Sequence, residues 1–486
     1  MDSSTTYIAP KTIPPLDPGF RPPVLTHRQF LSNVEASGNA RPLSLAIEDD
    51  TGRRLCYRTR LFAPDHPQAS ANTFYAERLA KYLLWQHGGW KLMVGGAPDI
   101  ANHLQEIYAP SGPRAFDAEF WGSRINQRPF SVVALQTDEI PESTTDAGSA
   151  ISPDWKGWRI GFDLGASDRK VALVKDGTLA LTEAGEPVLS TELPWDPRPQ
   201  TDPQWHYDKI MELLNLANST LQKVDASATI TAIGGSSAGI YSNGRVRMAS
   251  LFRGITSREQ FEAKVAPLFE RIAKDWGNIP FRIENDGDVT ALAGAIALNE
   301  GAVLGLAMGS SLAAGYVDEK RRIRGWKNEL AFAPVDYNPD AAVDEWSGDR
   351  GVGANYFSQQ AVARLIPEAG LSMPDIPDSD LPARLVRVQE KMAEGDQRAR
   401  RIYETIGCYL GYTIPHYCDF YQPVRHIELL GRVMTGEGGQ IILRTARDIL
   451  DREFPELAKQ IHFYEPDERE KRHGQAAAAA HLPEAH

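Results

Sequence analysis

The sequence predicts an α/β protein of about three domains. Its 486 residues exceed the roughly 100–200 residues that are typical of one domain. Hydrophobic residues make up 42% of the chain and charged residues 24%, which is typical of a chain that buries a core. Beyond Trp158, strand-like runs alternate with helical ones, as in folds whose functional residues lie where strands end.

The charge balance argues against nucleic acid as a partner. The chain carries 64 acidic and 52 basic side chains, a net charge of −12, and its first 150 residues have no basic surplus. Binding to a phosphate backbone needs clustered Lys and Arg. We expect no signal peptide and no membrane partner, because no apolar run is long enough to span a bilayer. Three scattered cysteines, Cys56, Cys408 and Cys418, indicate a reducing, cytoplasmic setting.

The first 156 residues predict a tail, a small module and a linker. Six prolines between Pro10 and Pro23 predict an extended tail over residues 1–25. Alternating apolar and polar residues around Asp50-Thr51-Gly52 predict a hairpin over residues 42–62. Residues 26–137 then form a small α/β module without a catalytic constellation, and residues 138–156 have the composition of a linker. Further elements of the module are expected as helices at 74–86 and 98–108 and strands at 91–94 and 130–136.

The stretch Arg159–Val174 predicts a phosphate-binding hairpin. An apolar strand ends at Asp163, and a turn of small residues follows at Gly165, Ala166 and Ser167. Such a turn exposes backbone N–H groups and a hydroxyl to a phosphate, and the carboxylate can hold Mg²⁺ through water. By itself the pattern fits equally well a hairpin with an incidental Asp. A helix at 204–222 and a strand at 229–233 are expected next.

Three further pieces follow in a fixed order. A strand runs into a Gly/Ser loop over Thr231–Tyr241, and a second strand ends at Asn285-Asp286 and opens a helix. A strand, turn and strand over Leu304–Val317 then carry Gly309-Ser310-Ser311 at the bend. Two phosphate-type turns separated by a carboxylate are what phosphoryl transfer requires, because the phosphates need clamps and the acceptor hydroxyl needs a base.

From Trp158 to the C-terminus this order of motifs resembles the ROK family of sugar kinases, within the actin-like, hexokinase-like ATPase superfamily. The resemblance implies a two-lobed kinase fold of the ribonuclease H-like class, here with an extra N-terminal α/β module. The N-lobe would comprise residues 157–284 and 465–486, and the C-lobe residues 285–464. It also implies ATP and Mg²⁺ as cofactors, a sugar-like small molecule as substrate, and a homodimer.

The resemblance assigns roles to individual residues. Asp286 matches the general base, and Asn285 matches the residue that holds a sugar hydroxyl. Asp168 stands where the family has Lys, so we expect Lys170 to compensate its charge near the first phosphate motif. The Ala-rich segment His473–Leu482 resembles the closing helix that packs back on the N-lobe. The expected ATP and phosphate ligands are Asp163, Gly165, Ala166, Ser167 and Lys170 in the first motif, Gly309, Ser310 and Ser311 in the second, and Gly431 at the adenosine, with Asp163 also holding Mg²⁺ through water.

The acceptor side departs from the family pattern. Glu329 keeps the position of a sugar-binding Glu, but Phe332 stands where the family has His. Val352 and Ala354 replace the last zinc-binding Cys and a further sugar-binding Glu. We therefore expect no zinc, because a structural zinc site needs three or four thiolate or imidazole ligands. Weaker recognition of glucose-type sugars is expected as well.

Two other functions stay open on the sequence. The altered acceptor residues also fit a catalytically inactive ROK-like regulator or interaction protein that binds a nucleotide or sugar. A DNA-binding repressor is disfavoured, because the N-terminal section has neither a basic face nor a recognisable helix-turn-helix. Asp286 also has a structural alternative as a helix N-cap, and Asp288 is expected to be a structural helix charge.

Overall fold

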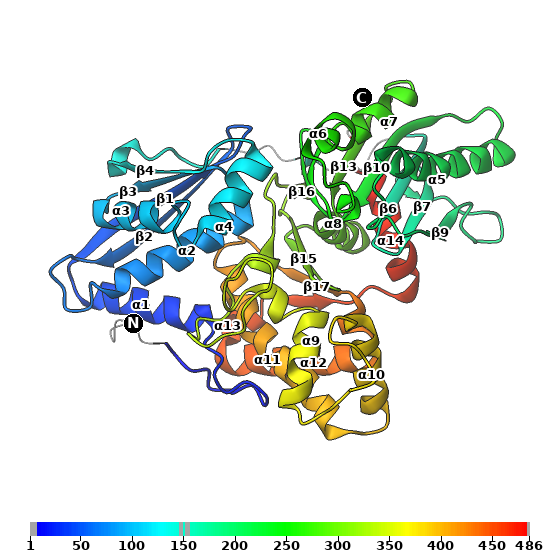
Figure 1. Cartoon of the computed structure of the whole chain (residues 1–486). Helices are drawn as coiled ribbons and strands as arrows, with labels where there is room; N and C mark the ends of the chain where they lie inside the picture. Colours follow the sequence, from blue (N-terminus) through cyan, green and yellow to red (C-terminus); the bar gives the residue numbers. More distant parts are fainter. Residues whose placement is uncertain (1–6, 145–148, 151–155, 484–486) are drawn as a thin grey trace.

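The computed structural model describes residues 7–144, 149–150 and 156–483. The first six residues of the expected tail and residues 145–148 and 151–155 of the expected linker lie outside these ranges. Figure 1 shows two lobes and an additional unit, drawn in blue and cyan, that contains the N-terminal part of the chain. The names N-lobe and C-lobe are kept for the two lobes with the bounds expected above, and the additional unit is called the N-terminal module.

The N-terminal module is a four-stranded sheet with helices, in the strand order β2-β1-β3-β4. The expected hairpin is confirmed: β1 and β2 pair antiparallel from Ala40↔Phe62 to Glu48↔Arg54. Its elements are α1 (Pro23–Ala36), β1 (Ala40–Glu48), β2 (Arg54–Phe62), α2 (Ala71–His87), β3 (Lys91–Gly95), α3 (Pro98–Ile107), α4 (Ala115–Ala118) and β4 (Ser131–Leu135).

The N-lobe contains a six-stranded sheet in which β6, β10 and β13 run parallel. Its strands are β6 (Trp158–Leu164), β7 (Asp168–Lys175), β8 (Thr178–Leu179), β9 (Ser190–Pro194), β10 (Ile230–Ser237) and β13 (Phe281–Asn285). A small hairpin and three helices complete the lobe before β13: β11 (Ile240–Ser242), β12 (Arg245–Met248), α5 (Pro203–Val224), α6 (Arg258–Gln260) and α7 (Leu268–Asp275).

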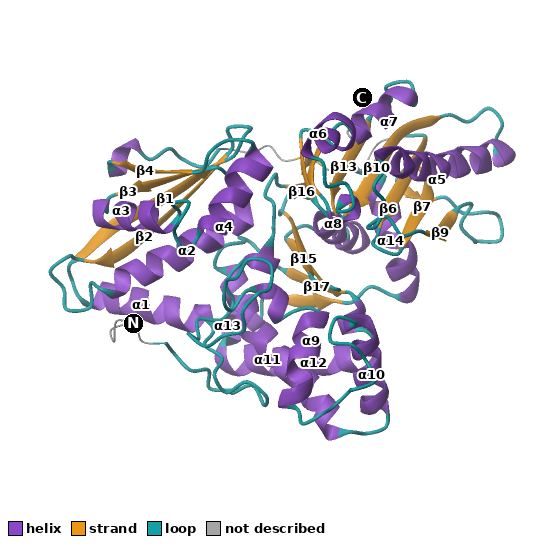
Figure 2. Ribbon diagram, viewed as in Figure 1, coloured by secondary structure: helices purple, strands orange, loops and turns teal. Residues whose placement is uncertain are grey.

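The C-lobe combines a second six-stranded sheet with most of the long helices, as Figure 2 shows. Helix α8 packs on β14 and β15 at the junction with the N-lobe. The strands are β14 (Val303–Met308), β15 (Leu312–Val317), β16 (Arg322–Ile323), β17 (His426–Leu430), β18 (His462–Tyr464) and, from the linker, β5 (Ser149–Ala150). The helices are α8 (Asp286–Leu298), α9 (Gln359–Glu368), α10 (Leu381–Ala393), α11 (Gln397–Cys418), α12 (Gly436–Glu453) and α13 (Pro455–Ala458).

The N-terminal module shares its core with the C-lobe. One continuous cluster of buried apolar side chains includes Leu79 and Trp85 of the module and Leu306, Tyr403 and Ile442 of the C-lobe. Most of the N-lobe has a separate core, built on β6, β10 and α5, although Ile240 of the N-lobe belongs to the first cluster. The module is therefore fused to the C-lobe by the hydrophobic effect, which is roughly proportional to the apolar area removed from water.

The described part of the tail lies against the C-lobe. Residues 7–22 contain no helix or strand, and Phe20 is completely buried, with its ring 4.8 Å from that of Tyr409. Tyr409 also donates a hydrogen bond of 2.6 Å to Asp17. Its prolines prevent regular structure, and its side chains anchor it to α11.

The C-terminal helix α14 (Glu468–Ala479) closes the N-lobe sheet on one face. Ile160 and Phe162 belong to the core on the α5 face, so Gly161 between them faces the other way, toward α14. A Cβ atom on Gly161 would lie 1.9 Å from the Ala476 carbonyl oxygen, and one on Gly234 would lie 1.7 Å from that of Ala479. The expected return of the Ala-rich segment to the N-lobe is thus confirmed.

Of the helices in the described part of the chain, none combines the length and the apolar character needed to cross a membrane.

We predict that Gly234→Ala destabilises the protein by about 1–3 kcal/mol, because the added methyl group clashes with the backbone of α14. Chemical denaturation of the two proteins measures the difference. Thr229→Ala, at an exposed position just before the same strand, is the control and should change stability little. An unchanged midpoint for Gly234→Ala would contradict the tight contact.

Candidate functional site

The candidate site lies where three parallel strands of the N-lobe end. Strand register places Asp163 of β6 beside Ser236 of β10, and Ser237 of β10 beside Asn285 of β13. The carboxyl ends of parallel strands form one edge of the sheet, which is where ligands bind in open α/β folds. The strand order thus brings Asp163 near Asn285 and Asp286, although they are distant in sequence.

Asp163 is a buried carboxyl, 7% exposed, that accepts a hydrogen bond of 2.7 Å from the Ser236 hydroxyl. Burial raises its pKa to about 6, and the negative charges of Asp286 and Asp168 add to the rise, against the hydrogen bond and the charge of Lys170. Gln475 of α14 donates to the Ser236 hydroxyl and to the Asp286 carbonyl oxygen, each at 3.1 Å. The closing helix therefore helps to fix both strand ends.

Asp286 is the first residue of α8, and Asn285 is its N-cap. The Asn285 side chain accepts from the Gly287 N–H at 2.8 Å and donates to the Gly239 carbonyl oxygen at 2.7 Å. The structural alternative for Asp286 is therefore wrong, because the capping contact belongs to its neighbour. Burial raises the pKa of Asp286 to about 6, against a hydrogen bond from the Gly287 N–H.

A cavity of about 840 Å³ brings seven of the expected site residues together. Its lining comes from both lobes and includes an aromatic wall formed by Phe332 and Trp346. The size suits a small-molecule ligand, since such sites are clefts of about 300–1,000 Å³. The seven expected residues in its lining are Asn285, Asp286, Gly309, Ser310, Ser311, Glu329 and Gly431.

The second phosphate turn connects β14 to β15 and faces this cavity. The Gly309 N–H donates to the Ser311 carbonyl oxygen at 2.9 Å, which closes the turn, and both serine side chains are exposed. Gly431 follows β17 with a φ of 96°, and a Cβ atom there would lie 2.4 Å from the Met308 carbonyl oxygen. Only glycine fits this crossing of two strand ends.

The first phosphate turn does not line the cavity, although Asp163 at its start lies at the same sheet edge. The Gly165 N–H donates to the Asp168 carbonyl oxygen, and the Ser167 hydroxyl donates to the Asp168 carboxylate, each at 2.9 Å. Ala166 is exposed. The Lys170 ammonium lies 3.7 Å from the Asp168 carboxylate. It therefore offsets the negative charge of Asp168, as expected from the sequence.

Among the carboxyl groups that line the cavity, that of Glu329 has the largest pKa shift. Burial raises its pKa to about 8, and the charge of Asp286 adds to the rise, while Lys327 opposes it. At neutral pH this side chain is therefore mostly protonated and can donate a hydrogen bond. The preceding Asn328 donates to the buried Asp288 at 2.8 Å, and burial raises the pKa of Asp288 well above its ordinary value. Asp288 is therefore structural, as expected, but as a buried hydrogen-bond partner and not as a helix charge.

The residues around Val352 and Ala354 do not fit the zinc site that the family resemblance would place there. Within residues 7–144, 149–150 and 156–483, no group of three or more His, Cys, Asp or Glu side chains could hold a metal ion. Val352 and Ala354 carry no ligand atoms in their side chains.

Sequence reasoning missed Ser236, Gln475 and Trp346. Ser236 lies in the stretch Thr231–Tyr241 noted above, where the structure extends strand β10 to Ser237, and its place beside Asp163 could have been inferred from the parallel strand order. Gln475 and Trp346 carry no local signal, because their contacts depend on tertiary packing.

The fold is shared with solved ROK proteins. A ROK hexokinase from Thermus thermophilus is 18% identical, with a TM-score of 0.50 over 67% of this chain and 98% of the hexokinase. A ROK family transcriptional regulator, a homolog of the E. coli MLC protein, is also 18% identical, with a TM-score of 0.50 over 68% of this chain and 79% of the regulator. No protein-family model and no curated protein matches the sequence. The chain thus has the two-lobed, hexokinase-like fold, and about a third of it lies outside either match.

We predict that Asp286→Asn is more stable than the wild type at pH 8, and that this gain is smaller at pH 5. A folded-state pKa of about 6 lies above the unfolded value, so the wild type loses stability as the pH rises to about 6 and the carboxyl ionises. The neutral amide avoids this loss of about 1–2 kcal/mol, after allowance for partial exposure.

Thermal melting at the two pH values measures this gain. Asp65→Asn, at an exposed position, is the control, and its stability relative to the wild type should be the same at both pH values. An Asp286→Asn protein that is less stable than the wild type at pH 8 would sink the interpretation.

Proposed function

We propose that the protein transfers the γ-phosphoryl group of ATP to a hydroxyl group of a sugar or sugar-like small molecule. The observation that carries the proposal is the cavity in which the Asp286 carboxyl lies with the second phosphate turn and with Glu329. The hexokinase-like fold supports it. The scattered free cysteines, Cys56, Cys408 and Cys418, support a cytoplasmic location for this reaction.

Asp286 acts as the general base. It takes the proton of the acceptor hydroxyl as the acceptor oxygen bonds to the γ-phosphorus, and the bond from that phosphorus to the bridging oxygen breaks to release ADP. A pKa of about 6 leaves the carboxylate mostly ionised at neutral pH, yet makes it a stronger base than an ordinary Asp.

Glu329 and Asn285 orient the acceptor. Because Glu329 is mostly protonated at neutral pH, its carboxyl donates a hydrogen bond to an acceptor oxygen, while the ionised Asp286 accepts one. Two carboxyl groups whose pKa values are held apart can thus serve as donor and base in one cavity. Asn285 is held by Gly239 and Gly287, so its position is fixed before the acceptor binds.

The two turns hold the phosphates. Ser310 and Ser311, with Gly309, offer hydroxyl and backbone N–H groups to the transferring phosphate. Gly165, Ala166, Ser167 and Lys170 would bind the other phosphates, and Gly431 would contact the adenosine. Orientation by such groups accounts for much of the rate in phosphoryl transfer.

Asp163 fits a magnesium ion. Its carboxylate is the oxygen ligand that Mg²⁺ prefers. Burial is the main cause of its raised pKa, and the charges of Asp286 and Asp168, which a bound cation would offset, add to the rise. Held by Asp163 through water, Mg²⁺ would neutralise phosphate charge.

The replaced acceptor residues favour a second candidate function. Phe332, Val352 and Ala354 stand where sugar and zinc ligands are expected, so a catalytically inactive ROK-like nucleotide- or sugar-binding regulator is the alternative. It differs from the kinase in one measurable respect, because it binds ATP without acceptor-dependent turnover.

We predict that ATP and Mg²⁺ with a panel of hexoses and amino sugars give acceptor-stimulated ADP release. Asp286→Ala should lower acceptor-dependent kcat/KM by about 10²–10⁴-fold, since that is the usual contribution of a general base. In the wild type the rate should fall below about pH 6, as Asp286 becomes protonated.

Asp451→Ala, at an exposed position of α12, is the matched control and should retain the wild-type rate. ATP binding by calorimetry without ADP release for every acceptor would favour the inactive regulator instead.

A further inference from the structure

The segment that carries Glu329 is hydrogen-bonded to the end of a helix in the N-terminal module. The N–H groups of Asn328 and Glu329 donate to the carbonyl oxygens of Gln86 and Trp85, each at 2.9 Å. These carbonyls lie in the last turn of α2, where a helix leaves its acceptors without intrahelical partners. The module therefore holds the backbone of Glu329, the residue that is expected to bind the acceptor.

A buried charge cluster attaches the following loop of the C-lobe to the same helix. Lys81 of α2 is completely buried, and its ammonium lies 3.0 Å from the Asp349 carboxylate and 2.8 Å from that of Asp117. Arg114 of the module lies 2.6 Å from the other Asp349 oxygen. Three cations and three carboxylates make up the cluster: Arg78, Lys81, Arg114, Glu77, Asp117 and Asp349.

Asp349 is the only carboxylate of this cluster that the C-lobe supplies. Burial would raise its pKa, but Lys81 and Arg78 hold it below the ordinary value, so the carboxylate is charged at neutral pH. Without it, the buried Arg78 and Lys81 and the partly buried Arg114 would face two carboxylates, and a buried charge that lacks a partner is strongly destabilising. The cluster therefore fixes where this loop docks.

The same loop forms the aromatic wall of the cavity. Trp346 is 45% exposed, and its ring meets that of Phe332 at 4.9 Å. From the module, the rings of Phe116 and Phe120 meet Trp346 edge-on at 5.1 and 5.6 Å. Trp85 lies behind Phe332 at 4.8 Å. Module side chains thus support the wall from outside the cavity.

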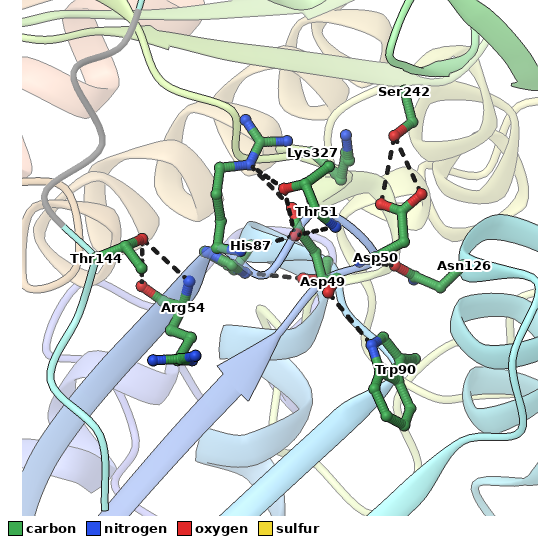
Figure 3. A network of polar contacts seen from close by, with 12 residues as sticks. Asp49, Asp50, Thr51, Arg54, His87, Trp90, Asn126, Thr144, Ser242 and Lys327 are labelled. Atoms are coloured by element: carbon green, nitrogen blue, oxygen red, sulfur yellow. Dashed lines mark hydrogen bonds and ion pairs between the residues drawn. The ribbon is translucent and has the colours of Figure 1, made fainter.

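Contacts between the module and the N-lobe are of a different kind. Figure 3 shows the turn between β1 and β2, where Asp50 points toward Ser242 of the N-lobe. Asp50 accepts a hydrogen bond of 3.3 Å from Ser242 and lies 3.2 Å from Arg247. A further polar contact joins Gln127 to Glu262 at 3.1 Å. These polar contacts contrast with the apolar core and buried charges that join the module to the C-lobe.

We propose that the N-terminal module is a structural part of the acceptor site, in which Asp349 is a positioning residue. The inference rests on the proposed function. Through the end of α2 and the charge cluster, the module fixes the backbone of Glu329, and through its aromatic side chains it fixes Trp346. Because a misplacement of about 1 Å can lower a rate by about 10²-fold, such support determines how well an acceptor binds.

The test compares Asp349→Asn with Asp340→Asn, which makes the same change at an exposed position of the same loop. Hydrogen exchange reports the amides of residues 328 and 329, and steady-state kinetics report the KM values for acceptor and ATP. For Asp349→Asn we expect about tenfold faster exchange at these amides and about a tenfold higher acceptor KM, with the ATP KM within twofold. Asp340→Asn should match the wild type, and Asp349→Glu should recover part of the acceptor affinity.

Unchanged exchange and an unchanged acceptor KM in Asp349→Asn would overturn the proposal. If this variant does not fold, Arg114→Gln, which leaves Lys81 paired with Asp349, takes its place with the same expected direction and the same overturning result. If the wild type turns over no acceptor, the kinase proposal fails, whereas faster exchange in the variant still supports the positioning role and unchanged exchange still refutes it.

Discussion

The site depends on the parallel alignment of β6, β10 and β13. Because these strands run in the same direction and in register, Asp163, Ser236 and Asn285 reach one edge of the sheet together. A parallel sheet must be covered on both faces, and α14 covers the face opposite α5 at a distance that admits no Cβ atom on Gly234. The same helix supplies Gln475, so the packing that completes the fold also fixes the strand end that opens α8.

Electrostatics set the chemistry at this edge. Three carboxyl groups, those of Asp163, Asp286 and Glu329, are held with raised pKa values of about 6, 6 and 8. Burial is the first cause in each case, and their mutual repulsion adds to the shifts of Asp163 and Glu329. In the charge cluster between the module and the loop that carries Trp346, the pKa shift is in the opposite direction. There Lys81 and Arg78 lower the pKa of Asp349 and keep it ionised, although most of its side chain is buried. One region thus holds carboxyls that bind protons readily, and the other holds a carboxylate as a fixed structural charge.

Local signals predicted the turns and strand ends of the candidate site, whereas other features depend on long-range contacts. The turns at Gly165 and Gly309 and the strand end at Asn285 are encoded by a few neighbouring residues, so the sequence was sufficient to find them. The same holds for the module hairpin, whose alternating residues fix its register. The docking of the module could not be predicted, because Lys81 and Asp349 are far apart in sequence and either one alone is an ordinary charged residue. The N-cap was assigned to Asp286 as an alternative, but Asn285 makes the contact, since both residues are good caps and only the backbone geometry separates them.

The arrangement of the module has a consequence for lobe closure. In the proposed phosphoryl transfer, closure of the cleft between the lobes would exclude water from the reaction. The module shares its core with the C-lobe, so it must move with that lobe as one body. Its polar contacts with the N-lobe include an exposed one between Gln127 and Glu262 and a largely buried one between Asp50 and Arg247. The contacts that the module makes with the backbone of Glu329 and with Trp346 would therefore stay in place during closure, whereas the hydrogen bond from Lys327 to the Tyr241 carbonyl oxygen of the N-lobe joins the two sides.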